Sequence, residues 1–457
     1  MPLELQQSLT KESSILIVGA GVFGLSTALH LAQDGFTNIK VLDRATIPSP
    51  YSAGNDLNKI VRAEYEDPFY TELALVCYST PKYMLEQFSF LTLFSRQDAI
   101  KQWQTPFWAP YYRETGYLLA TSPNAPQKSR DSLQKSFSSI KDHPAFPPGS
   151  FSQIETAEKT RKQFPMLQGK MDGWSGYLNR HAGYARAAKA LEHAAKACAE
   201  TGVKFVVGNS GYAVELLYEA GAKKICGGVK TADGSIHKAT RTILCLGAHI
   251  STLLPAIAPQ ITAKAWSVAH IQLNTTEAKA IKGCPVVNCR DLGFFFEPDP
   301  DTGLVKFSAN GAGYTNYISQ SETGTTVSVP PNSNEGIPEE DEILIKRLIG
   351  EAIPQLSGRD LIKKFICWCS DTADSEYIID FAPGSEGLMV AAGDSGHAFK
   401  MLPVAGKWVK DALLNGEQTT LRWRWKEGTS NGDDISWRVG QLKDIKDVEI
   451  SGSTSCL

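Results

Sequence analysis

The chain has 457 residues, of which 42% are hydrophobic and 21% charged, as is typical of a globular protein with two or three domains. Its formal net charge of −3 lacks the basic excess that nonspecific nucleic-acid binding requires. No apolar run approaches the ~20 residues of a membrane span, and no apolar segment precedes the first predicted strand. We therefore expect neither a membrane helix nor a secretory signal.

The chain opens with a predicted strand, SILIVG, because a continuous apolar run is typical of a parallel strand covered on both faces. The residues after the glycines, LSTALHLAQ, place their apolar side chains on one helical face. Gly35 ends this helix, and IKVLD predicts a second strand. These residues together predict a βαβ unit.

Further along the chain, ARAAKALEHAAKACAETG predicts a long helix from about Ala185 to about Gly202, and VKFVVG and RTILCLGA predict two more strands. Residues 263–365 contain shorter β-rich segments such as SVAHIQL and GLVKFSA. After Ala373, EYIID and GLMVAAG predict buried strands again, and LPVAGKWVKDALLNG predicts a closing helix. Beyond Trp425 the composition turns polar, which predicts an extended or poorly ordered tail.

Gly19, Gly21 and Gly24 form a G-x-G-x-x-G motif between the first strand and its helix. Glycines here permit a tight turn, a close approach to a pyrophosphate and close packing of helix on sheet. The phosphates would lie at the helix N-terminus, and Asp43 has the spacing of the acid that binds a ribose hydroxyl. The motif does not separate NAD from FAD, but its N-terminal position and a second strand-glycine element around Gly247 favour FAD.

Five segments, GNDLNKIVRAEY, GFFFEP, FICWCSDTAD, GDSGHAFK and WRW, together resemble the sarcosine oxidase-like flavoenzymes. Within that group the chain looks most similar to the fungal fructosyl amino acid and fructosyl peptide oxidases, the amadoriases. The resemblance spans about Ser14 to Trp425. It implies an FAD-dependent amine oxidase that takes a hydride from the C–H next to nitrogen, giving an imine, and passes the electrons to O2, giving H2O2.

The fold class is therefore predicted as α/β, with a Rossmann-type, D-amino-acid-oxidase-like FAD-binding domain and an inserted, mainly antiparallel β-sheet substrate domain. The FAD-binding domain is assigned residues 10–90, 170–262 and 360–425, the substrate domain residues 91–169 and 263–359, and the polar tail residues 426–457.

Cys367, the first cysteine of CWCSDT, matches the residue that binds the flavin 8α-methyl carbon as a thioether in this group. From the residues alone, Cys367 and Cys369 would be a buried pair of small hydrophobic side chains. A C-x-C without a second pair is also a poor zinc site, so no metal site is expected. The resemblance favours Cys367 as the covalent flavin anchor and leaves Cys369 without a role.

Lys400 matches the family lysine that holds the substrate carboxylate, and Arg62 matches the arginine that assists it. An ammonium and a guanidinium on one carboxylate bind it by charge-assisted hydrogen bonds and so orient the C–H that is oxidised. Lys59 lies three residues from Arg62 and could serve instead. For His397, a structural and a catalytic role remain open.

Lys306, in GLVKFSANG, matches the lysine that is assigned oxygen activation in this group, and a plain strand lysine is the alternative. The amadoriases that resemble this chain have an acidic residue four positions later, which can bind sugar hydroxyls. Here that position is Asn310, an amide without charge. Asn310 therefore argues against fructosyl substrates and leaves the oxidation of the amine unaffected.

The remaining predicted cofactor contacts follow from the dinucleotide motif and the resemblance. With Gly19, Gly21, Gly24, Asp43, Gly247 and Cys367, the predicted cofactor-binding set comprises Val22, Phe23, Arg44, Ser52, Asn55, Asp56, Lys59, Asp371, Gly396, His397, Phe399 and Lys400.

Three substrate classes remain open: a fructosyl amino acid, a simple imino acid such as sarcosine, pipecolate or saccharopine, and an N-methyl aromatic amino acid whose iminium is trapped by ring closure. A dehydrogenase that passes electrons to a carrier, and a dinucleotide-binding regulatory protein without turnover, are the alternatives outside this class. We expect a monomer or a weak homo-oligomer.

The cysteines are scattered and odd in number, which favours a reducing, intracellular setting over a disulfide framework. They are Cys77, Cys198, Cys226, Cys245, Cys284, Cys289, Cys367, Cys369 and Cys456. The final Ser455-Cys456-Leu457 is similar to the peroxisomal address Ser-Lys-Leu without its basic residue. A chance similarity is the preferred interpretation, and the cytoplasm and the peroxisome both remain open.

Overall fold

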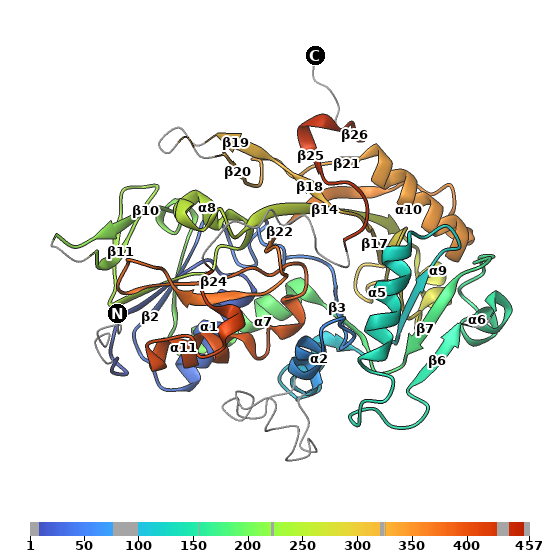
Figure 1. Ribbon diagram of the computed structural model, residues 1–457, viewed down its shortest axis with the longest axis horizontal. Helices are drawn as coiled ribbons and strands as arrows, with labels where there is room; N and C mark the ends of the chain where they lie inside the picture. Colours follow the sequence, from blue (N-terminus) through green and yellow to red (C-terminus); the bar gives the residue numbers. More distant parts are fainter. Residues whose placement is uncertain are drawn as a thin grey trace.

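The computed structural model describes residues 9–75, 99–154, 156–220, 224–319, 324, 326–426 and 438–451. Cys77, Cys456 and the C-terminal tripeptide Ser455-Cys456-Leu457 lie outside these residues. Two sheets stand side by side, each with its own helices, and the long strand β14 (Thr262–Gln272) runs across the top of both (Figure 1).

The first sheet has the strand order β23-β24-β13-β1-β2-β9. All neighbouring pairs are parallel except β23 with β24. Its strands are β1 (Ile15–Val18), β2 (Ile39–Asp43), β9 (Lys204–Val207), β13 (Arg241–Leu244), β23 (Ile378–Phe381) and β24 (Leu388–Ala392). Each of the six segments predicted as strands outside residues 263–365 forms one strand of this sheet, and the predicted Rossmann-type sheet is confirmed.

Three helices cover one side of this sheet: α1 (Val22–Gln33), α7 (Ala187–Glu200) and α11 (Ala405–Asn415). They correspond to the three predicted helices. Helices α1 and α11 pack so closely at Gly406 that a Cβ there would lie 1.9 Å from the Ser26 carbonyl oxygen. Only glycine fits at this position. The Ser26 hydroxyl also donates to the Leu402 carbonyl (2.6 Å) and accepts from the Gly406 N–H (2.7 Å).

The second sheet is larger and mostly antiparallel, with the order β25-β18-β14-β17-β16-β15-β5-β7-β6 and with β22 paired to β14. Its other strands are β5 (Tyr117–Thr121), β6 (Phe151–Ile154), β7 (Ser175–Asn179), β15 (Val286–Cys289), β16 (Gly293–Phe295), β17 (Leu304–Ala309), β18 (Tyr314–Thr315), β22 (Ile362–Asp371) and β25 (Lys443–Asp444). The predicted antiparallel substrate domain is confirmed.

Small sheets complete the β-structure. One contains β10 (Ala213–Tyr218), β11 (Cys226–Thr231) and β12 (Ile236–Lys238), and another contains β3 (Lys59–Val61), β8 (Gly183–Ala185) and β4 (Tyr112–Arg113). The two-stranded pairs are β19 (Tyr317–Ser319) with β20 (Thr326–Ser328), and β21 (Ile337–Pro338) with β26 (Ile450–Ser451).

The sheets divide the chain differently from the predicted segments at three places. Strand β7 pairs with β5 and β6, although its residues fall within the predicted FAD-binding segment 170–262. Strand β22 pairs along β14, although it falls within segment 360–425. In the tail, residues 438–451 carry β25 and β26, which pair with β18 and β21. In each case the sheet that the strand joins is determined by a pairing partner far away in the sequence.

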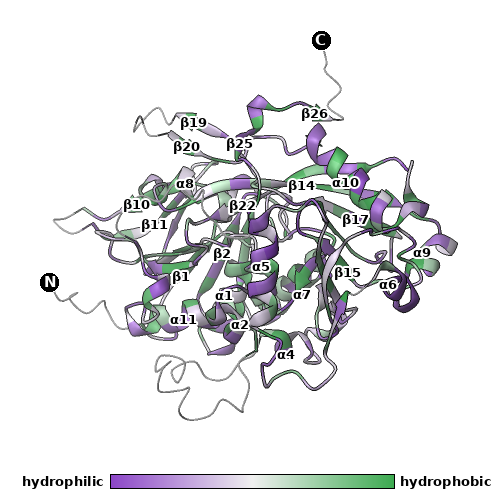
Figure 2. Cartoon of the chain, turned by 45° about the vertical axis from the view of Figure 1, so that its right-hand side comes forward, coloured by the Kyte–Doolittle hydropathy of each residue, from purple (hydrophilic) through white to green (hydrophobic). Residues whose placement is uncertain are grey.

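The remaining helices cover the outer faces. They are α2 (Pro68–Leu75), α4 (Ala99–Trp103), α5 (Gln127–Ser138), α6 (Ala157–Gln163), α8 (Ile250–Leu253), α9 (Thr275–Ile281) and α10 (Glu339–Ala352). Most of α5 is hydrophilic (Figure 2). The buried residues of α5 are three serines, Ser129, Ser132 and Ser136. None of the helices in the described part of the chain is long and apolar enough to span a membrane.

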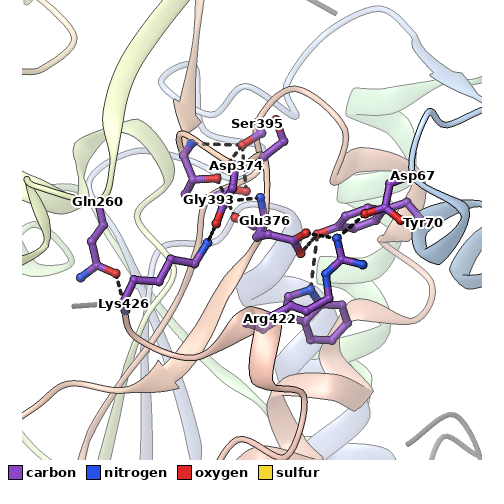
Figure 3. A network of polar contacts seen from close by, with 12 residues as sticks. Asp67, Tyr70, Gln260, Asp374, Glu376, Gly393, Ser395, Arg422 and Lys426 are labelled. Atoms are coloured by element: carbon purple, nitrogen blue, oxygen red, sulfur yellow. Dashed lines mark hydrogen bonds and ion pairs between the residues drawn. The ribbon is translucent and has the colours of Figure 1, made fainter. Parts of the chain in front are cut away.

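A polar network anchors the segment after α11 to the first sheet and to α2 (Figure 3). Arg422 bridges Asp67, next to α2, and Glu376, which also accepts from the Tyr70 hydroxyl (2.8 Å). Lys426 pairs with Asp374 nearby. Glu376 has a side-chain exposure of only 8%, so its charge depends on Arg422 and Tyr70.

We expect Arg422→Met to lower the free energy of unfolding by about 1–3 kcal/mol, because it leaves the buried Glu376 carboxylate with one partner fewer. Denaturant unfolding of both variants and the wild type would measure this. Lys426→Met is the matched control, since its partner Asp374 is 47% exposed and the loss should stay below about 1 kcal/mol. Equal losses in the two variants would contradict this account of the network.

Candidate active site

The glycine turn after β1 brings the N-terminus of α1 to a large cavity. Gly19 has φ +105°, and a Cβ there would lie 2.3 Å from the Cys245 carbonyl oxygen. A Cβ on Gly24 would lie 1.8 Å from the Gly19 carbonyl oxygen. Gly21 is the N-cap of α1 and supplies no side-chain cap, so N–H groups of the first turn remain open to an anion.

The cavity has a volume of about 730 Å³ and is lined by residues from both sheets. Seventeen of the predicted site residues line it: Gly19, Gly21, Val22, Phe23, Asp43, Arg44, Ser52, Lys59, Arg62, Gly247, Lys306, Asn310, Cys367, Gly396, His397, Phe399 and Lys400. Four do not, namely Gly24, Asn55, Asp56 and Asp371. One cavity therefore contains both the dinucleotide motif and the predicted substrate clamp.

Asp43 and Arg44 mark the nucleotide end of the cavity. The Asp43 carboxylate accepts from the N–H groups of Ala20 (2.9 Å) and Ala45 (3.0 Å), which fixes it at the end of β2. The Arg44 guanidinium lies 3.4 Å from the centre of the Tyr51 ring and is within 3.4 Å of His249 Nε2. Burial and the charge of Arg44 lower the pKa of His249 to about 3.

An uncapped helix N-terminus, an acid at the end of the second strand and a large cavity lined by residues from both sheets fit a dinucleotide cofactor. Sequence reasoning missed Tyr51 and His249 at this end. The sequence indicated these two residues only by their position, because each lies within a few residues of a predicted cofactor contact.

The buried Asp56 carboxylate is shared by two lysines that line the cavity. Lys306 Nζ donates to the Asp56 carboxylate and to the Asn58 carbonyl oxygen (2.9 Å). Lys59 Nζ lies 2.9 Å from the same carboxylate oxygen and 3.6 Å from Cys367 Sγ. Asp56 thus lies behind the cavity wall and holds two cations that line it.

This arrangement shifts the pKa values of its members. Burial and the charge of Lys59 lower the pKa of Lys306 to about 8, although Asp56 opposes the shift. Burial disfavours the Asp56 carboxylate, but the charges of Lys306 and Lys59 outweigh this and hold its pKa below the usual range. Hydrogen bonding by Cys369 lowers the pKa of Cys367, burial opposes the shift, and the charge of Lys59 adds to it. Cys367 is therefore the more acidic thiol of the C-x-C pair.

At the far end, Lys400 and Arg62 face the cavity together. Lys400 Nζ donates to the Tyr65 hydroxyl (2.8 Å) and to the His397 carbonyl oxygen (2.9 Å). The Arg62 guanidinium lies 5.0 Å from the centre of the Tyr65 ring, and its buried Nη1 has no acceptor. Burial and the charge of Arg62 lower the pKa of Lys400. Neither cation forms an ion pair with a carboxylate in the described residues.

Asn310, at the end of β17, lies against the strand β15. Its amide nitrogen donates to Asn288 Oδ1 (2.9 Å) and to the Cys289 carbonyl oxygen (3.0 Å). Asn288 in turn donates to the Tyr117 hydroxyl (3.0 Å). The Asn310 donors are therefore in use within the protein, and its carbonyl oxygen is the group left for a ligand.

Other predicted contacts have roles in the wall itself. Both ring nitrogens of His397 bond protein groups, the Tyr377 hydroxyl (3.0 Å) and the Ser375 carbonyl oxygen (2.8 Å). This geometry favours the structural role for His397. Asn55 donates to the Pro48 carbonyl oxygen (3.4 Å), away from the cavity. Ser52 accepts from the Gly54 N–H (3.2 Å).

The structure also adds Arg438 to the cavity, from the segment predicted as a polar tail. Its guanidinium lies 3.6 Å from the centre of the Trp266 ring and pairs with Asp371 (3.2 Å). A Cβ on Gly396 would lie 2.9 Å from Arg438 Nη2. Asp371 thus supports Arg438 rather than lining the cavity, and no local pattern marks Arg438 as part of the site.

The fold and the cavity are those of a dinucleotide-dependent oxidoreductase with a separate substrate sheet. Residues 14–412 match the family model "FAD dependent oxidoreductase" (DAO), and the chain belongs to this family and depends on FAD. The predicted family resemblance and enzyme class are confirmed. No group of three or more His, Cys, Asp or Glu residues that could hold a metal is present in the residues described.

The chain is similar over its length to several oxidases. It is 33% identical to L-saccharopine oxidase of Schizosaccharomyces pombe, over 96% of this chain and 99% of that protein. The fructosamine oxidase Amadoriase II of Aspergillus fumigatus superposes with a TM-score of 0.79 and 35% identity, over 96% of this chain and 97% of that structure. Monomeric sarcosine oxidase of Bacillus sp. (strain NS-129) is 27% identical over 41% of this chain and 47% of that protein.

Proposed function

We propose that the protein oxidises N-substituted, secondary-amine amino acids, with Arg62 and Lys400 holding the substrate carboxylate and O2 as the electron acceptor. The observation that carries this proposal is the pair of cations, without carboxylate partners in the described structure, in the cavity that also contains Cys367 and Lys306. An anion would satisfy the buried Arg62 Nη1 and offset the repulsion between Arg62 and Lys400.

When bound, FAD supplies the oxidation of the carbon next to the amine nitrogen and the transfer of electrons to O2. Gly19, Gly21 and the first turn of α1 would hold its pyrophosphate, and Asp43 a ribose hydroxyl. Arg62 and Lys400 would fix the substrate by its carboxylate and so present one C–H for oxidation.

We further propose that Cys367 binds the flavin covalently. A thiolate is the reactive form of cysteine, and the lowered pKa of Cys367 together with Lys59 at 3.6 Å favours that form. Cys369 has its pKa raised well above the usual value by the hydrogen bond with Cys367 and by burial. The two neighbouring cysteines therefore differ in the property that attachment requires.

Lys306 is proposed to assist the reaction with O2. Its buried ammonium places a fixed positive charge at the cavity, where it would stabilise negative charge that develops on oxygen. Asp56 and the Asn58 carbonyl hold the ammonium in one position.

A fructosyl amino acid is the second candidate substrate class, because the identity to Amadoriase II is as high as that to L-saccharopine oxidase. Against it stands Asn310, which offers one neutral acceptor where the amadoriases that this chain resembles have an acid. We therefore favour an imino acid or another N-substituted amino acid without a sugar.

The covalent link is tested by the mass of the denatured protein. We expect one FAD in addition to the polypeptide mass, and a tryptic map with the flavin on Cys367. Cys367→Ser should abolish the adduct, because an alcohol is a far weaker acid than this thiol. Cys369→Ser is the matched control and should keep it. Flavin that leaves the wild type completely on acid precipitation would contradict the covalent link.

The clamp is tested with purified enzyme and peroxide release on sarcosine, L-pipecolate, L-saccharopine, N-methyl-L-tryptophan and fructosyl-valine. On the best substrate, Arg62→Met and Lys400→Met should each lower kcat/KM by roughly 100-fold, mainly through KM, because each leaves one buried cation to hold the carboxylate alone. Activity confined to fructosyl-valine would reverse our preference against sugars. If the enzyme oxidises no member of the panel, the proposed function is wrong.

The role of Lys306 predicts a pH dependence for the reaction of the reduced enzyme with O2. Lys306 is charged below its pKa of about 8 and neutral above it. The rate constant should therefore fall about tenfold between about pH 7 and about pH 9. Lys306→Met should lower it roughly 100-fold and remove the pH step, whereas the surface variant Lys346→Met should keep both. Stopped-flow mixing with O2 measures these values, and a step that survives in Lys306→Met would assign it to another group.

A further inference from the structure

A third cation, Arg290, faces the substrate end of the cavity and belongs to none of the interactions described above. It follows β15 directly, and its backbone N–H donates to the Ala120 carbonyl oxygen (2.8 Å), which fixes the start of its side chain. Its Nη2 donates to the Ser136 hydroxyl (3.0 Å), and its buried Nε has no acceptor. Within the described part of the chain, Arg290 pairs with no carboxylate.

Arg290 belongs to the same wall as the carboxylate clamp. Asn288, two residues earlier, donates to the Tyr117 hydroxyl, and the centre of the Tyr117 ring lies 5.9 Å from the Arg62 guanidinium. Burial and the nearby charge of Arg62 lower the pKa of Arg290, while the Tyr117 and Tyr177 hydroxyls and Glu66 oppose the shift. Two guanidiniums that repel each other in a partly dehydrated cavity require anions for compensation.

Two glutamates that also line the cavity act on these arginines by charge, Glu64 on Arg62 and Glu66 on Arg290, and both hydrogen-bond other groups. Glu64 is fully buried and accepts from the Asn179 side chain (2.7 Å) and from the Ala63 N–H (3.0 Å). Glu66 accepts from the Ser132 hydroxyl. Neither glutamate lies within ion-pair distance of a cation in the described structure.

Helix α5 contributes one side chain to the cavity lining, the hydroxyl of Ser136. Its buried residues are serines, and Ser136 lines the cavity. The Ser136 oxygen accepts from Arg290, which leaves its proton for a ligand. A guanidinium and a hydroxyl side by side match the acceptor oxygens of a carboxylate. An aliphatic or aromatic substituent would leave both hydrogen-bond donors without an acceptor.

We propose that Arg290, with Ser136, binds a second carboxylate of the substrate, so that the preferred substrates are N-substituted amino acids with two acidic groups. The inference rests on the proposed function, because Arg62 and Lys400 are taken to hold the first carboxylate. Arg290 is then a specificity-determining residue, which selects a diacid over its neutral counterpart. A second carboxylate would also give Arg290 the direct ion pair that it lacks among the described residues.

The first test measures binding without turnover. Glutarate and its monoamide, glutaramate, have nearly the same shape and differ by one negative charge. Each is titrated into the FAD-loaded enzyme, and binding is followed by the change in flavin absorbance. We expect the wild type to bind glutarate about 10- to 100-fold more tightly, as one charge-assisted pair provides. Arg290→Gln should remove most of this preference, and Arg290→Lys, which keeps the charge without the fork, should keep part of it.

The second test measures turnover with the matched pair N-methyl-L-glutamate and N-methyl-L-glutamine. The ratio of their kcat/KM values, from peroxide release, should favour the diacid in the wild type and fall by about 10- to 100-fold in Arg290→Gln. Arg347→Gln is the control for loss of an arginine, since Arg347 pairs with Glu351 on the surface of α10 and should leave the ratio as it is.

The outcomes separate this inference from the function on which it rests. If neither glutarate nor glutaramate perturbs the flavin and no substrate is oxidised, the clamp and the proposed function fail. If the wild type binds both ligands equally well, the second-carboxylate site is wrong and the oxidase assignment stands. The wild-type comparison requires no variant, so a variant that folds poorly does not affect the decision. If Arg290→Gln keeps the full preference for glutarate, another cation binds the second group.

Discussion

The site depends on one buried carboxylate that holds two cations, Asp56 with Lys306 and Lys59. Asp56 and Lys59 lie at the start of the small sheet that contains β3, whereas Lys306 lies on β17 of the large sheet. The ion pairs therefore join the small sheet to the large sheet. Lys59 also reaches Cys367 on β22, so one acid sets the positions of the proposed flavin anchor and of the proposed oxygen-side lysine. Two ammonium groups on one carboxylate leave a net positive charge at this point.

The charges at the substrate end follow a different rule. Lys306 and Lys59 form ion pairs inside the protein, but Arg62, Lys400 and Arg290 form none with the described residues. A buried cation without an anion costs stability, and residues of a binding site accept that cost because the ligand removes it. This difference within one cavity distinguishes the cations that have a structural role from the cations that are proposed to bind the substrate. It also explains why bound acids should stabilise the fold.

Local patterns predicted the parts of the site that depend on local geometry. The glycines after β1 and Asp43 at the end of β2 follow from a strand, a turn and a helix in sequence, and the structure has each of them there. The strands β7 and β22 were assigned to the other sheet, because their partners, β5 and β14, are far along the chain. Arg438 and Arg290 were missed for the same reason. Each lies in an irregular segment, and the position of that segment depends on packing against elements far away in the sequence.

Asn310 shows how neighbouring residues limit what one substitution does. Read alone, an amide in place of an acid weakens a sugar site but can still donate to hydroxyls. In the structure its donors are held by Asn288 and the Cys289 carbonyl, and Asn288 is held by Tyr117. Arg290 follows Asn288 at the end of β15, so the wall that carries the amide of Asn310 also carries a cation. The neutral amide of Asn310 and the positive charge of Arg290 act in the same direction, and both favour an acidic substrate over a neutral, hydroxyl-rich one.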